Sequence, residues 1–194
     1  MMTNSEIKDY WISKGQKVTI FSPGILQPLL LQEHTKKFLS IVGLPPEAAL
    51  YLSFSTNKQG SWNSIARIID IDTALDSSFK NLIQIGSDGS GNAIVINTEN
   101  NDIIELLDHD NGFKLIFINS SIKSFSFSLL AYSRFISSIL ANSYFDTHFT
   151  DEQFNTLKNR LILADKDFDK SEFWHSELDM LLGNREAYKH ESGN

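Results

Sequence analysis

The sequence predicts an α+β fold, with a central and mostly antiparallel sheet flanked by helices, on three observations. Between residues 81 and 118, short apolar segments alternate with polar turns, which is typical of strands joined as a meander. From Ile122 onward, the apolar residues recur at steps of three and four, the period of a helix. One helical segment precedes the strands, and we expect the helices to bury their apolar faces on the sheet.

We expect a single domain over residues 1–194, with a core over about residues 17–183 and a polar tail over residues 184–194. Forty-one per cent of the residues are hydrophobic, which is enough for a sizeable core and excludes wholesale disorder. The absence of cysteine excludes disulfides and thiolate zinc sites. We expect a cytoplasmic protein without a membrane partner, because no segment approaches about 18 consecutive apolar residues and no secretory signal is evident.

Ahead of the meander, the first dozen residues are expected to be a frayed lead or a short helix. Residues 32–42 predict a helix that Gly43 ends and the following prolines prevent from continuing. Clusters of β-branched and aromatic residues predict short strands at residues 17–22, 51–55 and 65–71.

Within the meander, apolar segments bounded by glycine, asparagine and aspartate predict four strands, at residues 81–85, 93–97, 103–107 and 113–118. The first turn, over residues 86–91, contains three glycines. It matches neither a Walker loop nor a nucleophile elbow and precedes a strand, so we interpret it as a tight turn.

Three helices are expected after the meander. The first covers residues 122–140. The second begins at a capping box of Thr150 with Gln153, which phenylalanines 149 and 154 bracket as a hydrophobic staple. The same pattern at Asp169 and Glu172 predicts the start of the third, which Gly183 is expected to end.

No catalytic motif is evident, so an enzyme is the third hypothesis after a binding protein and an adaptor, and we expect no cofactor and no metal. The five histidines are scattered, without the spacing of a zinc-binding helix. The aspartates at 165, 167 and 169 resemble the start of a calcium loop, but Lys170 and Ser176 replace its required glycine and glutamate.

The charge is distributed unevenly. The chain has 24 acidic and 17 basic side chains, a net charge of −7, and direct nucleic-acid binding is therefore not expected. Between Lys80 and Lys114 there is no lysine or arginine, and six acids occur there: Asp88, Glu99, Asp102, Glu105, Asp108 and Asp110. Turns favour aspartate, which explains part of this pattern. The alternative is an acidic face that steers a basic partner, and both interpretations stay open.

Trp62 is a further candidate for partner binding, because tryptophan is enriched in interface hot spots and this one lies beside a Gly-Ser turn. Trp174 lies within an amphipathic helix and is expected in the core.

Four segments together resemble the SUKH superfamily, in particular its fourth bacterial group. They are FLSIVGLPPEA (residues 38–48), IGSDGSGNAIVINTENNDIIELLDHD (85–110), FINSSIKSF (117–125) and FWHSELDMLLG (173–183). Their order carries the resemblance, which extends over roughly residues 18–183.

The resemblance implies a binding protein without catalytic residues. Bacterial SUKH proteins are typically immunity proteins that bind and block a polymorphic or contact-dependent toxin, often a nuclease or a nucleic-acid deaminase. A toxin of that kind usually carries a basic substrate groove, so an acidic partner would approach it quickly. We therefore expect the six acids and Trp62 to contact a basic protein toxin. An adaptor or scaffold protein of a regulatory complex is the alternative.

Overall fold

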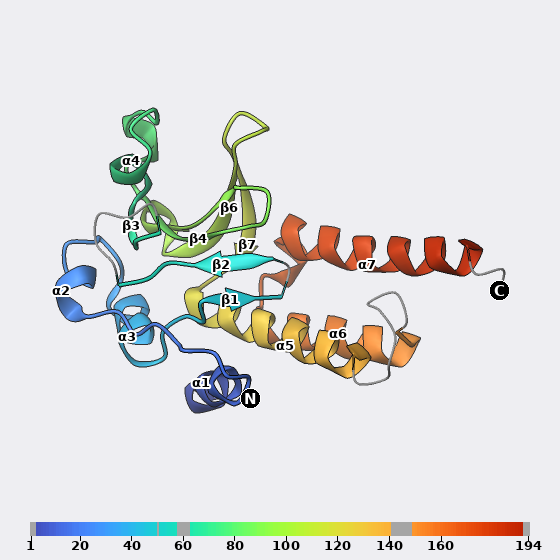
Figure 1. Ribbon diagram of the computed structural model, residues 1–194. Coiled ribbons are helices and arrows are strands. Elements are labelled where there is room, and N and C mark those ends of the chain that lie inside the picture. Colours follow the sequence, from blue (N-terminus) through green and yellow to red (C-terminus); the bar gives the residue numbers. More distant parts are fainter. Residues whose placement is uncertain (1–2, 50, 58–62, 141–148, 192–194) are drawn as a thin grey trace.

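A computed structural model describes residues 3–49, 51–57, 63–140 and 149–191 (Figure 1). It confirms the α+β class. The helices are α1 (Asn4–Ser13), α2 (Pro23–Leu26), α3 (Glu33–Ile41), α4 (Ile68–Ile71), α5 (Ile122–Leu140), α6 (Asp151–Ala164) and α7 (Glu172–Glu191). The strands are β1 (Glu47–Ala48), β2 (Leu52–Phe54), β3 (Ala66–Arg67), β4 (Leu82–Ser87), β5 (Ala93–Asn97), β6 (Ile103–Asp108) and β7 (Lys114–Asn119).

The strands form one sheet in the order β1-β2-β4-β5-β6-β7, and β3 also pairs with β4. All of these pairings are antiparallel, as the short polar turns predicted. A β-bulge interrupts β4 between Gln84 and Gly86. Gly86 is needed there, because a Cβ atom would fall on the backbone carbonyl oxygen of Ser53 in β2.

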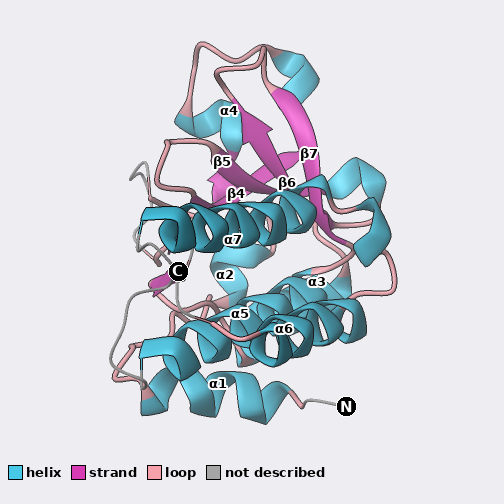
Figure 2. Ribbon diagram, turned by 90° about the vertical axis from the view of Figure 1, so that its right-hand side faces the viewer, coloured by secondary structure: helices cyan, strands magenta, loops and turns pink. Residues whose placement is uncertain are grey.

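The main core lies between one face of the sheet and α5. Ile94, Ile96 and Ile104 point into it from the central strands, and Phe125 and Leu129 point into it from α5. Figures 1 and 2 show α1 on the far side of α5 from the sheet, with α6 alongside α5. The predicted helix over residues 122–140 is thus covered by the sheet on one side and by α1 and α6 on the other. This explains why the sequence of α5 is so apolar.

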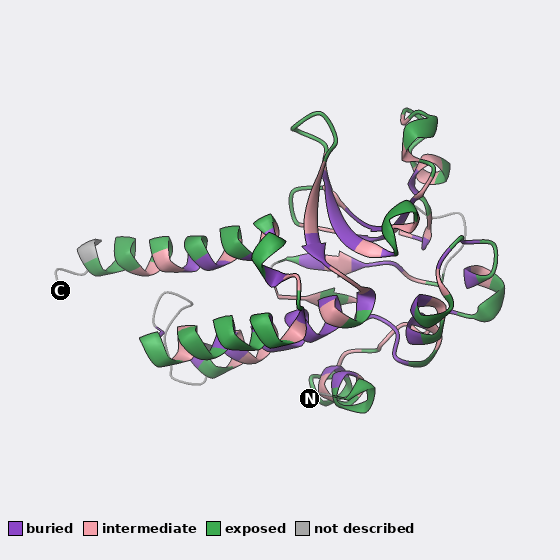
Figure 3. Cartoon of the chain, turned by 180° about the vertical axis from the view of Figure 1, so that it is seen from behind, coloured by how far each residue is buried: buried purple, intermediate pink, exposed green. Residues whose placement is uncertain are grey.

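The opposite face of the sheet has a smaller cover. Ile68 of α4 packs there against Val95 and Leu107 in a separate cluster. Figure 3 shows buried residues, in purple, along the central strands and exposed residues, in green, on the outer sides of the helices. A side chain that alternation places on this second face can therefore be buried as well.

The Gly-Leu-Pro segment after α3 pairs with the connection between α1 and α2 through a backbone bridge. The amide of Thr19 donates to the carbonyl of Leu44 at 2.8 Å, and the amide of Leu44 donates back at 3.1 Å. Gly43 has a φ of +76°, and a Cβ atom there would fall on the Thr19 carbonyl oxygen. Glycine is therefore required twice at this position, by conformation and by space.

A buried polar network joins β7, α5, α6 and α7. Asn119 accepts a hydrogen bond from Trp174 Nε1 at 2.9 Å and donates to Asp165 at 2.9 Å. Asp165 also accepts from the amide and hydroxyl of Ser120, at 2.6 and 2.7 Å. The Ser171 hydroxyl donates to the Ile118 carbonyl at 2.9 Å and accepts from the Trp174 amide at 3.2 Å. The network therefore fixes where α7 leaves the sheet.

Two predictions ahead of the meander were wrong. Residues 17–22 make only the single bridge at Thr19, because the next residues turn into α2. Residues 65–71 split into the two-residue strand β3 and the single-turn helix α4. Of the two alternatives for the first dozen residues, the short helix is confirmed: Thr3 and Glu6 make a capping box, and Trp11 is buried.

Two predictions about the last helix were also wrong. It begins at Glu172 rather than near Asp169, because Ser171 provides the capping hydroxyl. It also continues through Gly183 to Glu191, so most of the expected polar tail is helical. The other capping box was correct: Thr150 and Gln153 cap α6, and the rings of Phe149 and Phe154 stack with their centroids 5.9 Å apart.

Candidate functional site

The six acids of the meander lie at two opposite ends of the sheet and in its interior. Asp88 follows β4, Asp108 is the last residue of β6, and Asp110 lies in the β6–β7 turn, at the same end of these strands. Glu99 and Asp102 lie in the β5–β6 connection at the other end. They therefore do not form one continuous exposed patch.

Asp102 and Glu105 are buried. The carboxylate of Asp102 accepts a hydrogen bond from the amide of Gln32 at 2.7 Å and is inaccessible to solvent. Glu105 points from β6 toward the second face of the sheet, where it accepts a hydrogen bond from Asn97 Nδ2 at 2.8 Å. Burial raises the pKa of the Glu105 carboxyl. These two side chains cannot make the first contact with a partner in this conformation.

The other end of the sheet holds what we call the turn cluster: Asp88, Asp108 and Asp110. Asp88 organises the glycine-rich turn, because it accepts hydrogen bonds from the amides of Ser90 and Asn92 at 2.9 and 2.8 Å. Asn92 accepts in turn from the amide of His109 at 3.1 Å, which ties the two turns together. Asp110 is exposed, with His109 Nε2 at 3.2 Å. This cluster is the accessible part of the acidic pattern on the sheet, apart from Glu99.

A groove of about 1030 Å³ begins beside the turn cluster. It lies between the β1–β2 hairpin and the glycine-rich turn on one side and α5 and α7 on the other. Its lining residues are Glu47, Ala48, Ala49, Tyr51, Leu52, Ser53, Asp88, Gly89, Ser90, Tyr132, Ile136, Phe173, Glu177, Met180, Leu181 and Asn184. We call this depression the α7 groove. Its described lining holds three carboxylates and no lysine, arginine or histidine.

Glu177 is the most unusual of these carboxylates. It occupies the middle of an apolar row on α7, four residues after Phe173 and four before Leu181. One carboxylate oxygen, Oε2, is inaccessible and has no hydrogen-bond partner among the described residues. Burial raises the pKa of the Glu177 carboxyl. An acid in this position is energetically costly unless a donor or a cation meets it.

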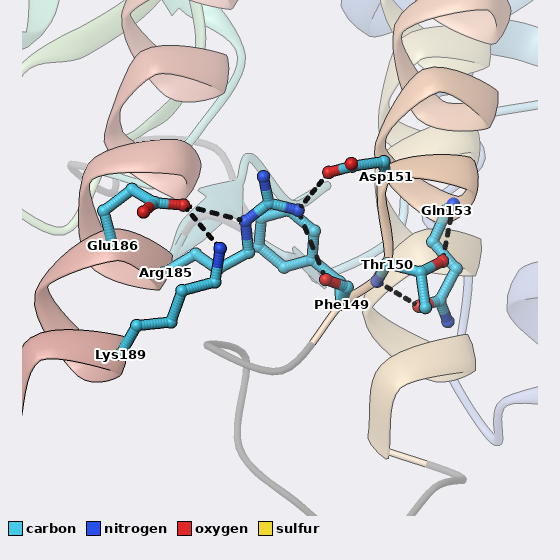
Figure 4. Close-up of polar contacts among 7 residues, drawn as sticks. All are labelled: Phe149, Thr150, Asp151, Gln153, Arg185, Glu186 and Lys189. Atoms are coloured by element: carbon cyan, nitrogen blue, oxygen red, sulfur yellow. Dashed lines mark hydrogen bonds and ion pairs between the residues drawn. The ribbon is translucent and has the colours of Figure 1, made fainter. Parts of the chain in front are cut away.

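Arg185 attaches the second half of α7 to the start of α6 (Figure 4). Its Nη1 atom donates to Asp151 at 2.7 Å and to the carbonyl of Phe149 at 3.4 Å. Its guanidinium lies 4.8 Å from the ring centroid of Phe149, and Glu186 approaches Nε at 3.6 Å. We call these contacts the Arg185 clasp. They hold α7, one wall of the groove, at a fixed distance from the α5–α6 pair.

Trp62, the other predicted contact residue, lies outside the described residues. The sequence did not predict the groove. Glu47 and Glu177 are far from the acidic segment and join Asp88 only through the fold. An acid within the apolar row of α7 was the one available indication.

Within the described residues, no group of three or more histidine, aspartate or glutamate side chains is placed to hold a metal ion. No described helix combines the length and the apolar character that crossing a bilayer requires.

Comparison with known proteins identifies the family. A search of curated proteins and a search of solved structures found no match. The family model described as SUKH-4 immunity protein matches residues 12–176, which includes the whole sheet, α5 and the beginning of α7. The resemblance to the SUKH superfamily is thereby confirmed, and the chain belongs to the SUKH-4 immunity protein family.

Proposed function

We propose that this protein binds a cognate toxin domain with a basic substrate site, a nuclease or a nucleic-acid deaminase, and blocks it without catalysis. Membership of an immunity protein family supports the general role. The α7 groove supports the basic character of the partner, because its described lining carries carboxylates and no cationic side chain. Complementary charge accelerates association and discriminates against other proteins.

The proposed contact surface combines the α7 groove with the turn cluster. Asp88 belongs to both, so the two features are continuous. Asp108 and Asp110 extend the negative charge along the same end of the sheet, and Glu47 extends it along the edge strand β1. Trp62 remains in the proposal as an aromatic anchor, and Glu99 as a more distant charge. Asp102 and Glu105 are left out because they are buried.

The proposed partner also determines where the protein acts. A toxin that attacks nucleic acid reaches its substrate in the bacterial cytoplasm, so we place the immunity protein there. The negative net charge makes direct binding of nucleic acid unfavourable. The proposed inhibitor needs no cofactor, because it acts by covering the substrate site of the toxin.

The decisive experiment is co-expression with the product of the adjacent gene. We expect the two proteins to elute as one complex in size-exclusion chromatography and the toxin to lose its activity in that complex. Cells that produce the toxin should survive only with the immunity gene. Failure to form a complex at low salt would overturn the proposal. A stable complex with several proteins, none of them toxic, would favour the adaptor alternative.

A further inference from the structure

The α7 groove has an apolar floor and an acidic lining. Leu52, Tyr132 and Leu181 are buried in its floor, and Phe173 and Ile136 are partly buried beside them. A small polar ligand would leave this floor without contacts. A long side chain with an apolar stem and a positive end fits both parts of the groove.

The three carboxylates of the groove differ in their hydrogen-bond partners and in their exposure to solvent. Both oxygens of Asp88 accept hydrogen bonds within the glycine-rich turn. Glu47 is exposed on the edge strand and is well hydrated. Glu177 has the covered and unpartnered oxygen Oε2. A buried acceptor without a donor lowers stability, and a cation that approaches the same carboxylate from the groove would reduce that cost. Glu177 is therefore the group in the groove that gains most from a cationic ligand.

The aromatic rings that line the groove favour a guanidinium over an ammonium group. Phe173 of α7 lines the groove, Tyr132 of α5 lies in its floor, and the lining residue Tyr51 has 88% of its surface exposed. A guanidinium is planar, stacks on aromatic rings and is more weakly hydrated than an ammonium group. It can also donate two parallel hydrogen bonds to one carboxylate.

We propose that the α7 groove accepts an arginine side chain of a protein partner, with its guanidinium on Glu177 and its stem along the apolar floor. The identification of that partner as the toxin rests on the proposed function. The arginine site itself rests on the groove.

A titration of the full chain with small probes tests the site without any toxin. The probe is N-acetyl-arginine methylamide, and its neutral isostere N-acetyl-citrulline methylamide is the comparison. Nuclear magnetic resonance of the ¹⁵N-labelled protein should show amide shifts at Ser53, Gly89 and Leu181 with the arginine probe only. The corresponding lysine probe should bind more weakly. Equal shifts with arginine and citrulline would overturn the proposal, and equal binding of lysine would overturn the preference for a guanidinium.

Two variants of α7 locate the contact. E177Q removes the charge and keeps the shape, so the arginine probe should bind about tenfold more weakly. D179N makes the same charge change at an exposed acid that does not line the groove, and binding should be unchanged. Equal losses in both variants would indicate a general charge effect and overturn the site.

The toxin then separates the two proposals. If the toxin binds E177Q as tightly as the natural protein, the arginine site is wrong while the immunity function stands. If no toxin partner exists but the probe binds as described, the function is wrong and the site stands.

Discussion

Glu105 is a carboxylate inside the sheet, where Asn97 provides its hydrogen bond and burial raises its pKa. The folded protein thus binds this proton more tightly than the unfolded chain. The free energy of unfolding should therefore fall as the pH rises from the ordinary value near 4.5 through the raised folded value. E105Q removes this titration, so it should flatten the pH dependence and stabilise the protein at pH 7. Urea unfolding between pH 4 and 7 measures both effects.

The control for Glu105 is Glu99, which is exposed in the adjacent turn. E99Q removes the same charge without removing a buried one, so its stability should follow that of the natural protein across this pH range. If the stability curves of E105Q and the natural protein run parallel, the loss of stability at higher pH does not come from Glu105.

Gly43 provides a second test at the level of a residue. G43A must place a side chain at a φ of +76° and against the backbone of Thr19, so we expect a loss of about 3 kcal/mol or more. G24A is the matched control, because no atom lies within 4 Å of the new Cβ and the residue is in α2. It should leave stability unchanged or raise it slightly. Thermal unfolding of both variants provides the comparison, and equal stability would show that the bridge at Thr19 adjusts freely.

Among the elements, α7 is attached to the start of α6 by Arg185. The Arg185 clasp combines an ion pair with Asp151 and a cation–π contact with Phe149, each worth about 0.5–1 kcal/mol. R185A should therefore loosen the second half of α7 and accelerate amide hydrogen exchange at residues 184–189. Exchange before residue 178 should change little, because Trp174 anchors the first half of α7 in the core.

The control for the clasp is R160A, which removes an exposed arginine of α6. Its exchange rates in α7 should equal those of the natural protein. If R185A leaves exchange at residues 184–189 unchanged, packing of α7 on α5 holds this wall of the groove without the clasp.

Elements with explicit end residues could be predicted from the sequence. α3 ends just before Gly43, as predicted. β5 has the predicted boundaries, and α6 begins directly after its N-cap residue Thr150. The last helix could not be bounded, because Ser171 caps it while bonding to β7, a contact distant in sequence. Gly183 does not end α7, since later turns are held by the Arg185 clasp and local pairs such as Lys189 with Glu186. Tertiary contacts overrode the local patterns in both places.

On the scale of the whole molecule, the candidate site was predicted only in part. The acidic segment was evident, but alternation along β6 places Glu105 on a face that α4 helps to cover, and chain distance alone could not reveal this. The α7 groove assembles β1, the glycine-rich turn, α5 and α7, so no local pattern contains it. Residues 177, 180, 181 and 184 of its wall lie beyond the segment matched by the family model.

The charge distribution of the whole molecule leads to the last prediction. The turn cluster and α1 lie on opposite sides of α5 (Figure 1), so charges can be removed near or far from the proposed contact surface. D108N/D110N should slow association with the toxin several-fold at low salt and leave dissociation nearly unchanged, because accessible charges at the rim of an interface act mainly on the association rate. D9N/E33Q removes two exposed acids from α1 and α3 and should have a much smaller effect. Stopped-flow measurements at several salt concentrations test this, since the difference should vanish near 1 M, where the Debye length is about 3 Å. Equal slowing by both double variants would mean that net charge, rather than its position at the turn cluster, governs recognition.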